Sequence, residues 1–291
     1  SQHRPVLPWK VWYTGPNFRY ERAQKGRFRQ FDQVGVEALG SDDPHLDAEI
    51  ISLAWQFYER LGLRDVTLLV NSLGNADDRG RYIESLTAHF SASIDDLSAE
   101  SLKTLKTNPL RLLDSRRPED IEVVASAPQM SDYLSSDASE HFDGVCRVLD
   151  SLGITYEVSP RLVRGLDYYV RTTFEFVAGQ LDAAQDAIGG GGRYDGLAET
   201  LGAPPTAGVG LALGVDRTLL AGDAEGVFLP PTSAIDIFVV DTSGGDEAVL
   251  ITNEVRQAGW RVDRAWDDRC LLYTSDAADE GLGVDLGGRR I

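Results

Sequence analysis

The stretch WYTGPNFRYERAQKGRFRQFDQVGVE, residues 12–37, predicts two antiparallel strands joined by a basic loop. Aromatic and β-branched residues recur through residues 10–19 and 28–39, which favours a strand in each segment. The loop between them begins at Glu21, and Arg22, Lys25, Arg27 and Arg29 lie within eight residues. The net charge of the whole chain is −18, so this loop is a local basic surface in an acidic protein. Such acidity argues against indiscriminate binding of nucleic acid.

A second informative stretch is RGLDYY, residues 164–169. Gly165 lets the backbone approach a ligand closely. Arg164 can grip a carboxylate or phosphate through two parallel hydrogen bonds. Tyr168 and Tyr169 can stack on a flat ring and bond its polar edge. The combination suits a small zwitterion with a planar side chain next to a phosphate, although a strand end with two core tyrosines and a surface ion pair fits the same six residues.

A third stretch runs from GGGGRYDGL at residue 189 to GVGLALGVDR ending at residue 217. In their order along residues 8–222, the three stretches resemble the class II aminoacyl-tRNA synthetases: motif 2, a signature segment and motif 3. RGLDYY resembles the signature peculiar to histidyl-tRNA synthetases. The resemblance implies an α+β fold in which helices flank an antiparallel sheet, with a helical insertion and the start of an α/β anticodon-binding domain.

The resemblance also implies a reaction, in which ATP activates histidine to histidyl-adenylate and the histidyl group passes to histidine tRNA. It implies catalytic roles for Arg19, Arg164 and Arg217, of which Arg19 and Arg217 bind ATP together with Glu21. Mg²⁺ would bridge the phosphates, and no residue of the chain is assigned as a metal ligand. The implied histidine-binding residues are Gln33, Glu37, Arg164, Tyr168, Tyr169 and Tyr194. Family members work as cytoplasmic homodimers, so we expect the same here.

Punctuating residues predict further elements and domain limits. Asp43-Pro44 starts a helix that Gly62 ends, and a helix before Gly153 ends in the same way. Strands are expected at residues 66–70, 155–158, 172–177, 235–240 and 260–265, the strand at 235–240 being buried, with a helix at 247–258. The expected parts are a catalytic core at 1–74 and 139–225, an insertion domain at 75–138, and a truncated anticodon-binding domain at 232–269.

The two ends suggest that the chain is a piece of a longer bacterial protein. Motif 1, which forms the dimer interface in the family, would precede Ser1. Residues 270–291 match the translation of a transposase-end adapter from sequencing libraries, so we expect them to be an artefact. The fragment itself is expected to activate histidine weakly or not at all.

Two observations bear on the compartment. The chain has two cysteines, Cys146 and Cys270, and without the adapter-like tail no internal disulfide is possible, which fits a reducing cytoplasm. No apolar run is long enough to span a bilayer, so we expect no membrane partner.

Two alternatives to a synthetase remain. One is a non-catalytic paralogue that regulates the ATP phosphoribosyltransferase of histidine biosynthesis. The other is a sensor domain that binds uncharged tRNA. The intact Arg19, Arg164 and Arg217, and the β-α-β segment after Pro231, favour the synthetase.

Overall fold

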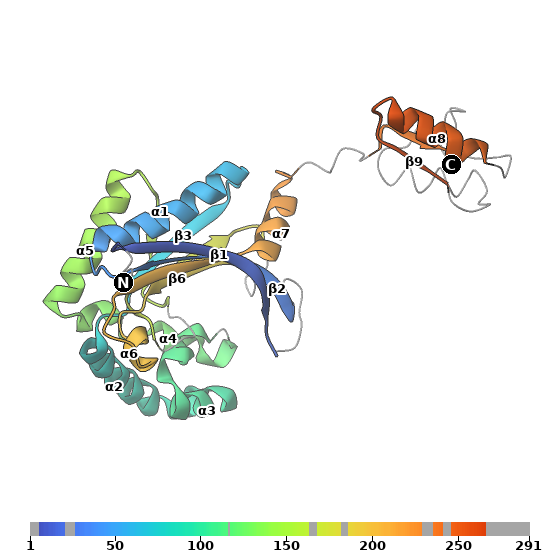
Figure 1. The fold of residues 1–291 in the computed structure, drawn as a ribbon. Coiled ribbons are helices and arrows are strands. Elements are labelled where there is room, and N and C mark those ends of the chain that lie inside the picture. The colour runs from blue at the N-terminus through green and yellow to red at the C-terminus, as the bar shows by residue number, and fades with distance from the viewer. Residues whose placement is uncertain are drawn as a thin grey trace. The chain divides into compact units, whose positions relative to one another are not determined.

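The computed structural model describes residues 6–20, 27–115, 117–162, 168–181, 186–228, 235–240 and 246–265 (Figure 1). The chain divides into two compact units, Ser1–Val227 and Phe228–Ile291, and each is described by itself below. The predicted adapter-like tail, residues 270–291, lies outside the described residues.

The first unit is built on a mixed, mostly antiparallel sheet in the order β1-β2-β7-β6-β5-β3-β4, in which only the β3–β4 pair is parallel. The expected α+β architecture is confirmed. The two strands of the opening stretch are present, and the predicted strand at 155–158 is reduced to two residues. The strands are β1 Trp9–Phe18, β2 Gln30–Leu39, β3 Val66–Ser72, β4 Glu157–Val158, β5 Val170–Ala178, β6 Ala187–Arg193 and β7 Gly208–Gly214.

Three helices cover one face of this sheet: α1 Pro44–Leu61, α5 Ser136–Ser151 and α7 Val215–Glu225. The start of α1 is capped, because the Asp43 carboxylate accepts from the His45 backbone N–H at 2.9 Å. Gly62, in the left-handed region at φ 85°, ends this helix as predicted. The side chains between helices and sheet form an apolar core, with Ile51, Leu68, Phe174 and Phe176 fully buried.

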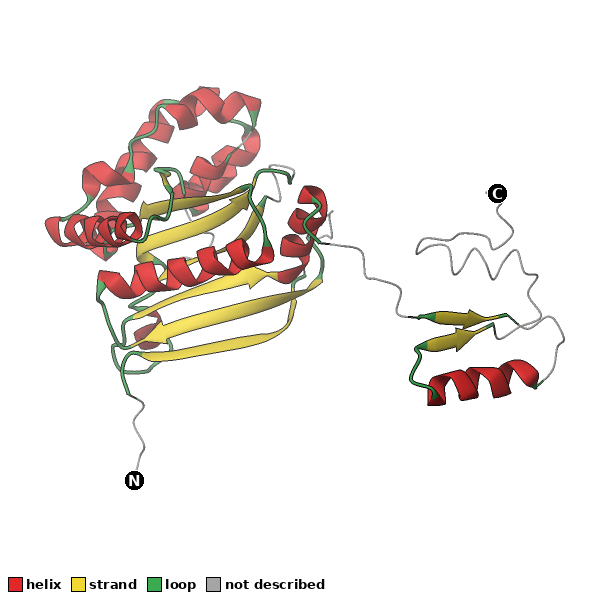
Figure 2. Cartoon of the chain, turned by 90° about the horizontal axis from the view of Figure 1, so that it is seen from above, coloured by secondary structure: helices red, strands yellow, loops and turns green. Residues whose placement is uncertain are grey.

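A group of short helices lies apart from this face, as Figures 1 and 2 show. It comprises α2 Ala76–Ala92, α3 Ala99–Thr107, α4 Ile121–Ala125 and the 3₁₀ turns Ile94–Asp96, Pro109–Asp114, Pro118–Asp120 and Met130–Tyr133. These elements, the helical module, pack around Tyr82, Leu86, Phe90 and Leu112, a core separate from that of the sheet. The predicted insertion domain at 75–138 covers this region, and its limits stay a prediction.

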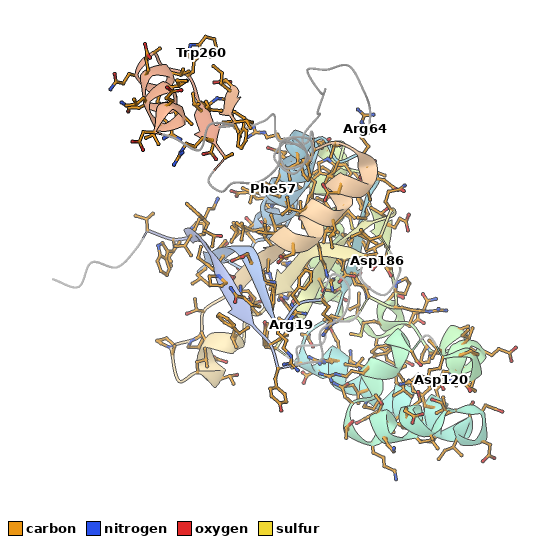
Figure 3. All side chains as sticks on the ribbon, turned by 90° about the vertical axis from the view of Figure 1, so that its right-hand side faces the viewer. Arg19, Phe57, Arg64, Asp120, Asp186 and Trp260 are labelled. Carbon is orange, nitrogen blue, oxygen red and sulfur yellow. The ribbon has the colours of Figure 1, made fainter. Side chains whose placement is uncertain are left out.

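A buried carboxylate holds the helical module together. Asp120, labelled in Figure 3, accepts hydrogen bonds from the backbone N–H of Ser98 and from the hydroxyls of Ser98, Ser101 and Ser115. These bonds lower the pKa of the Asp120 carboxyl although burial acts in the opposite direction. The charge of Asp120 therefore stabilises a junction of three segments.

The second unit contains the predicted β-α-β segment: β8 Ile237–Val239, α8 Glu247–Gln257 and β9 Val262–Arg264, with the two strands parallel. The expectation of a buried first strand is wrong, since Ile237 is 37% exposed. Among the described residues of this unit, α8 is the one helix that packs on the strands. None of the helices in the described part of the chain is both long and apolar enough to cross a membrane.

Candidate active site

The face of the sheet opposite α1 carries a row of register partners that crosses four strands. Glu37 on β2 pairs with Gly210 on β7, which pairs with Gly192 on β6, which pairs with Thr173 on β5. Partners in a ladder point to the same face. One acidic side chain therefore stands at the edge of a floor made of glycines.

The glycines of this floor leave space that neighbouring side chains fill. A Cβ at Gly210 would lie 1.8 Å from the Glu37 Oε2 atom, and one at Gly208 would lie 2.5 Å from the Tyr194 ring. A Cβ at Gly192 would lie 2.9 Å from the Tyr169 ring, and one at Gly35 would lie 2.2 Å from Tyr13. Four glycines thus let three tyrosines and a carboxylate lie directly on the sheet.

Glu37 is the polar centre of this floor. Its carboxylate accepts hydrogen bonds from the Tyr13 hydroxyl at 3.1 Å and from the Tyr194 hydroxyl. Burial raises the pKa of Glu37, and the two hydrogen bonds oppose that shift. Burial and the neighbouring Glu37 charge raise the pKa of Tyr194, so its hydroxyl stays a donor. The arrangement can accept a hydrogen bond from a ligand N–H at the remaining carboxylate lone pairs.

The three tyrosines of the predicted wall lie together, and their role as a wall stays a prediction. The rings of Tyr168 and Tyr169 lie 4.7 Å apart between centroids, and Tyr168 lies edge-on to Tyr194 at 6.3 Å. These tyrosines come from two segments of the chain, one before β5 and one after β6. Their rings form one aromatic cluster, which is the kind of surface on which a small planar ring stacks.

Cationic side chains gather toward another part of the same face. The Arg19 guanidinium carbon lies 3.7 Å from the centroid of Phe31, which shares the face of β2 with Gln33 and Glu37. Arg217, in the first turn of α7, donates to the Ala187 carbonyl at 2.7 Å. Burial lowers the pKa of Arg217, and the charges of Arg27 and Arg19 lower it further. Arg217 thus lies in the field of two further arginines and of the Glu175 and Asp186 carboxylates.

The structure brings seven of the predicted site residues into this unit on or near one face: Arg19, Gln33, Glu37, Tyr168, Tyr169, Tyr194 and Arg217. Gln33 pairs with Gly15 and Gly214, two residues along β2 from Gly35. Arg164 and Glu21 lie outside the described residues, so their roles stay predictions. Figure 3 shows Arg19 close to the ends of β1 and β2.

Sequence reasoning missed Tyr13, which contacts Glu37 directly. It also missed the buried ion network behind the pocket. Arg193 is completely buried and donates from Nε to Asp47 at 3.1 Å, while His141 contacts the same carboxylate at 2.8 Å. Tyr13 is the register partner of Gly35, a pairing that the sequence alone did not show. No local sequence pattern predicts the ion pair between Asp47 and Arg193.

A family model described as "Histidyl-tRNA synthetase" matches residues 3–218. The chain belongs to the histidyl-tRNA synthetase family. It is 46% identical to the histidine–tRNA ligase of Geobacillus kaustophilus strain HTA426, over 97% of this chain and 67% of that protein. It is 48% identical to the histidine–tRNA ligase of Rhodococcus erythropolis strain PR4, over 100% of this chain and 69% of that protein.

The apo histidyl-tRNA synthetase of Staphylococcus aureus has the same fold. Its crystal structure matches with a TM-score of 0.67 and 35% identity, covering 96% of this chain and 68% of that protein. The chain therefore spans about two thirds of the length of these relatives. The predicted family, fold and enzyme class are confirmed, and these names favour the synthetase over the regulatory paralogue.

Proposed function

We propose that this chain holds the histidine-activating site of a histidine–tRNA ligase. The observation that carries the proposal is the placement of the Glu37–Tyr13–Tyr194 cluster on the same sheet face as Arg19. The cluster suits an imidazole, and the arginines suit a triphosphate. A site for histidine thereby adjoins a site for ATP.

Neutral imidazole has one N–H donor and one nitrogen acceptor, so its recognition needs a partner of each kind. The Glu37 carboxylate accepts from the N–H, and the Tyr169 hydroxyl donates to the other nitrogen. The amide oxygen of Gln33 accepts from the α-ammonium group. Tyr168 and Tyr194 close the sides, and the glycine floor lets Glu37, Tyr169 and Tyr194 lie close to the sheet.

ATP binds with its triphosphate against Arg19, Arg217 and Arg27, whose mutual repulsion is relieved by the anion. Arg19 holds the α-phosphate and Arg217 the γ-phosphate, while Glu21 contacts the adenine. ATP enters as its magnesium complex. Glu175 on β5 and Asp186 act electrostatically on Arg217, and their carboxylates would hold the Mg²⁺ that accompanies ATP.

The first step joins a histidine carboxylate oxygen to the α-phosphorus and breaks the bond to the bridging oxygen, so pyrophosphate leaves. Arg164 bridges the carboxylate and the α-phosphate with its planar fork. In the second step a ribose hydroxyl at the tRNA end attacks the histidyl carbonyl, and AMP leaves. Catalysis rests on positioning and on positive charge that is already in place. The enzyme acts as a cytoplasmic homodimer on histidine tRNA.

Histidine-dependent exchange of pyrophosphate into ATP tests the first step, with the chain and with the complete product of its gene. Titration calorimetry of the chain with histidine tests the pocket independently of turnover. We expect binding of histidine and exchange that no other amino acid supports in the complete product. Histidine binding without exchange would favour the non-catalytic paralogue, and exchange with another amino acid would overturn the assignment of substrate.

A further inference from the structure

The segment that carries Tyr168 and Tyr169 is hydrogen-bonded, through the backbone of Arg171, to the residues that lead into the helical module. Leu73, just after β3, donates its backbone N–H to the Arg171 carbonyl at 2.7 Å, and the Arg171 N–H donates to the Gly74 carbonyl at 2.7 Å. Arg171 has φ 50°, a conformation that is uncommon for a residue with a side chain. Tyr169 thus lies two residues from a tight backbone junction with the entrance of the module.

Hydrogen bonds at this same junction join the start of the helical module to its end. Asn75 and Asp78 form a capping box at the start of α2. The Asp78 carboxylate also accepts from the Ser135 backbone N–H at 3.1 Å and from the Ser135 hydroxyl at 3.0 Å. Ser135 follows the last element of the module, so Asp78 ties the entrance of the module to its exit. The first turn of α2 is therefore a fixed support.

Arg79 extends from this support to the pocket. Its Nη1 atom donates to the Tyr169 carbonyl oxygen at 3.4 Å. On the other side, Arg171 donates to Asp137 at 2.7 Å, and its Nη1 atom lies 3.3 Å from His141 Nδ1 on the same helix α5. The segment that carries Tyr168 and Tyr169 is thus held between α2 and α5.

We infer that Arg79 is a positioning residue for histidine recognition, because it fixes the main chain of Tyr169 and through it the ring that faces the imidazole. The inference rests on the proposed function. It makes the helical module, and not the sheet alone, a determinant of histidine affinity. A change in the position of α2 would alter the affinity for histidine without touching the ATP site.

The test compares two losses of the hydrogen bond with a rescue and a control. Arg79→Ala removes the side chain, Arg79→Met keeps the apolar stem without a donor, and Arg79→Lys keeps a charged donor. Lys106→Ala is the control, because Lys106 is an exposed cation in the last turn of α3 in the same module. Calorimetry of the chain with histidine, histidinol and ATP gives three dissociation constants, and exchange assays of the complete gene product give KM and kcat.

We expect Arg79→Ala and Arg79→Met to lower the affinity for histidine about tenfold, which corresponds to the loss of one hydrogen bond of this kind. The affinity for histidinol, which keeps the imidazole but not the carboxylate, falls by the same factor. The dissociation constant for ATP stays within about twofold of the wild-type value. Arg79→Lys recovers most of the affinity, and Lys106→Ala behaves as the wild type. In exchange assays the KM for histidine rises while kcat is nearly constant.

Three results would overturn the inference: unchanged histidine affinity in both donor-free variants, loss confined to histidine with histidinol unaffected, or equal loss of histidine and ATP. If Arg79→Ala fails to fold, Arg79→Met and Arg79→Lys still separate the two outcomes. A wild-type chain that binds no histidine would contradict the proposed function as well. If the wild-type chain binds histidine and the Arg79 variants bind it with the same affinity, this inference alone is contradicted.

Discussion

The Glu37 carboxylate on β2 accepts a hydrogen bond from the Tyr194 hydroxyl, although the two residues lie 157 positions apart in the chain. Gly210 makes the contact possible, because it lies between their strands without a side chain. A buried carboxylate with phenol donors offers its remaining lone pairs to a ligand. The affinity for histidine should therefore depend on the two carboxylate oxygens of Glu37.

Glu37→Gln tests that dependence. Replacing the charged acceptor by a neutral amide removes about 1.5–3 kcal/mol from a hydrogen bond to a charged group. The KM for histidine should rise roughly 10–150-fold, while the KM for ATP stays within about twofold. Glu49→Gln is the matched control, since Glu49 pairs with Lys10 on the exposed surface of the same unit. Equal KM values for histidine in Glu37→Gln and the wild type would remove Glu37 from the site.

Gly210→Ala tests the glycine floor. The added methyl group would lie 1.8 Å from Glu37 Oε2, so the carboxylate has to move. We expect at least a tenfold loss of histidine affinity and a lower midpoint of thermal unfolding, since overpacking costs about 1–3 kcal/mol. Gly15→Ala, on the neighbouring β1, is the control, because nothing lies within 4 Å of the added atom. Similar behaviour of the two variants would contradict the role of the floor.

Arg217→Gln tests the phosphate end. Loss of a preorganised cation that stabilises developing negative charge costs roughly 10²–10³ in rate. Histidine-dependent exchange should fall by that factor, whereas calorimetry should give an unchanged dissociation constant for histidine. Arg60→Gln, an exposed arginine in the last turn of α1, should leave both quantities as they are. A parallel loss of histidine binding in Arg217→Gln would show that the two ends of the site are not separable.

Asp47→Asn tests the buried network behind the pocket. Burial opposes ionisation of Asp47, but the hydrogen bonds from His141 and Arg193 outweigh it and lower the pKa of the carboxyl below 3.8. Breaking such a pair takes the Asp47 charge away from the buried Arg193, which keeps Asp195 at 2.9 Å, so we expect a cost of up to about 3–5 kcal/mol. We expect the free energy of unfolding to fall by that amount at neutral pH.

The pH dependence of the Asp47 contribution has a definite sign. A carboxyl whose pKa is lower in the folded than in the unfolded protein stabilises the fold above the unfolded value. That contribution is lost as the pH falls through the folded pKa. Urea unfolding of wild type and Asp47→Asn should therefore give a difference that is constant near neutrality and shrinks below pH 3.8. Asp42→Asn, exposed and five residues earlier, is the control for the loss of a surface carboxylate.

Local chemistry accounts for the elements that were predicted correctly. The Asp43 cap and Gly62 fix the ends of α1. The aromatic and β-branched residues of 10–19 and 28–39 predict β1 and β2 within two residues. The prediction that β8 is buried was wrong, because a run of apolar residues does not show which other segments cover it. Burial is a property of packing between distant segments.

By itself the sequence determined the order of the elements and the family, because residue type and spacing carry those features. Only the tertiary structure decided that Tyr13 and Tyr194 share Glu37, that Asp47 meets Arg193, and that Arg79 reaches Tyr169. These contacts depend on strand register and helix position. Register is set by the summed packing of both faces of the sheet, which no single segment contains.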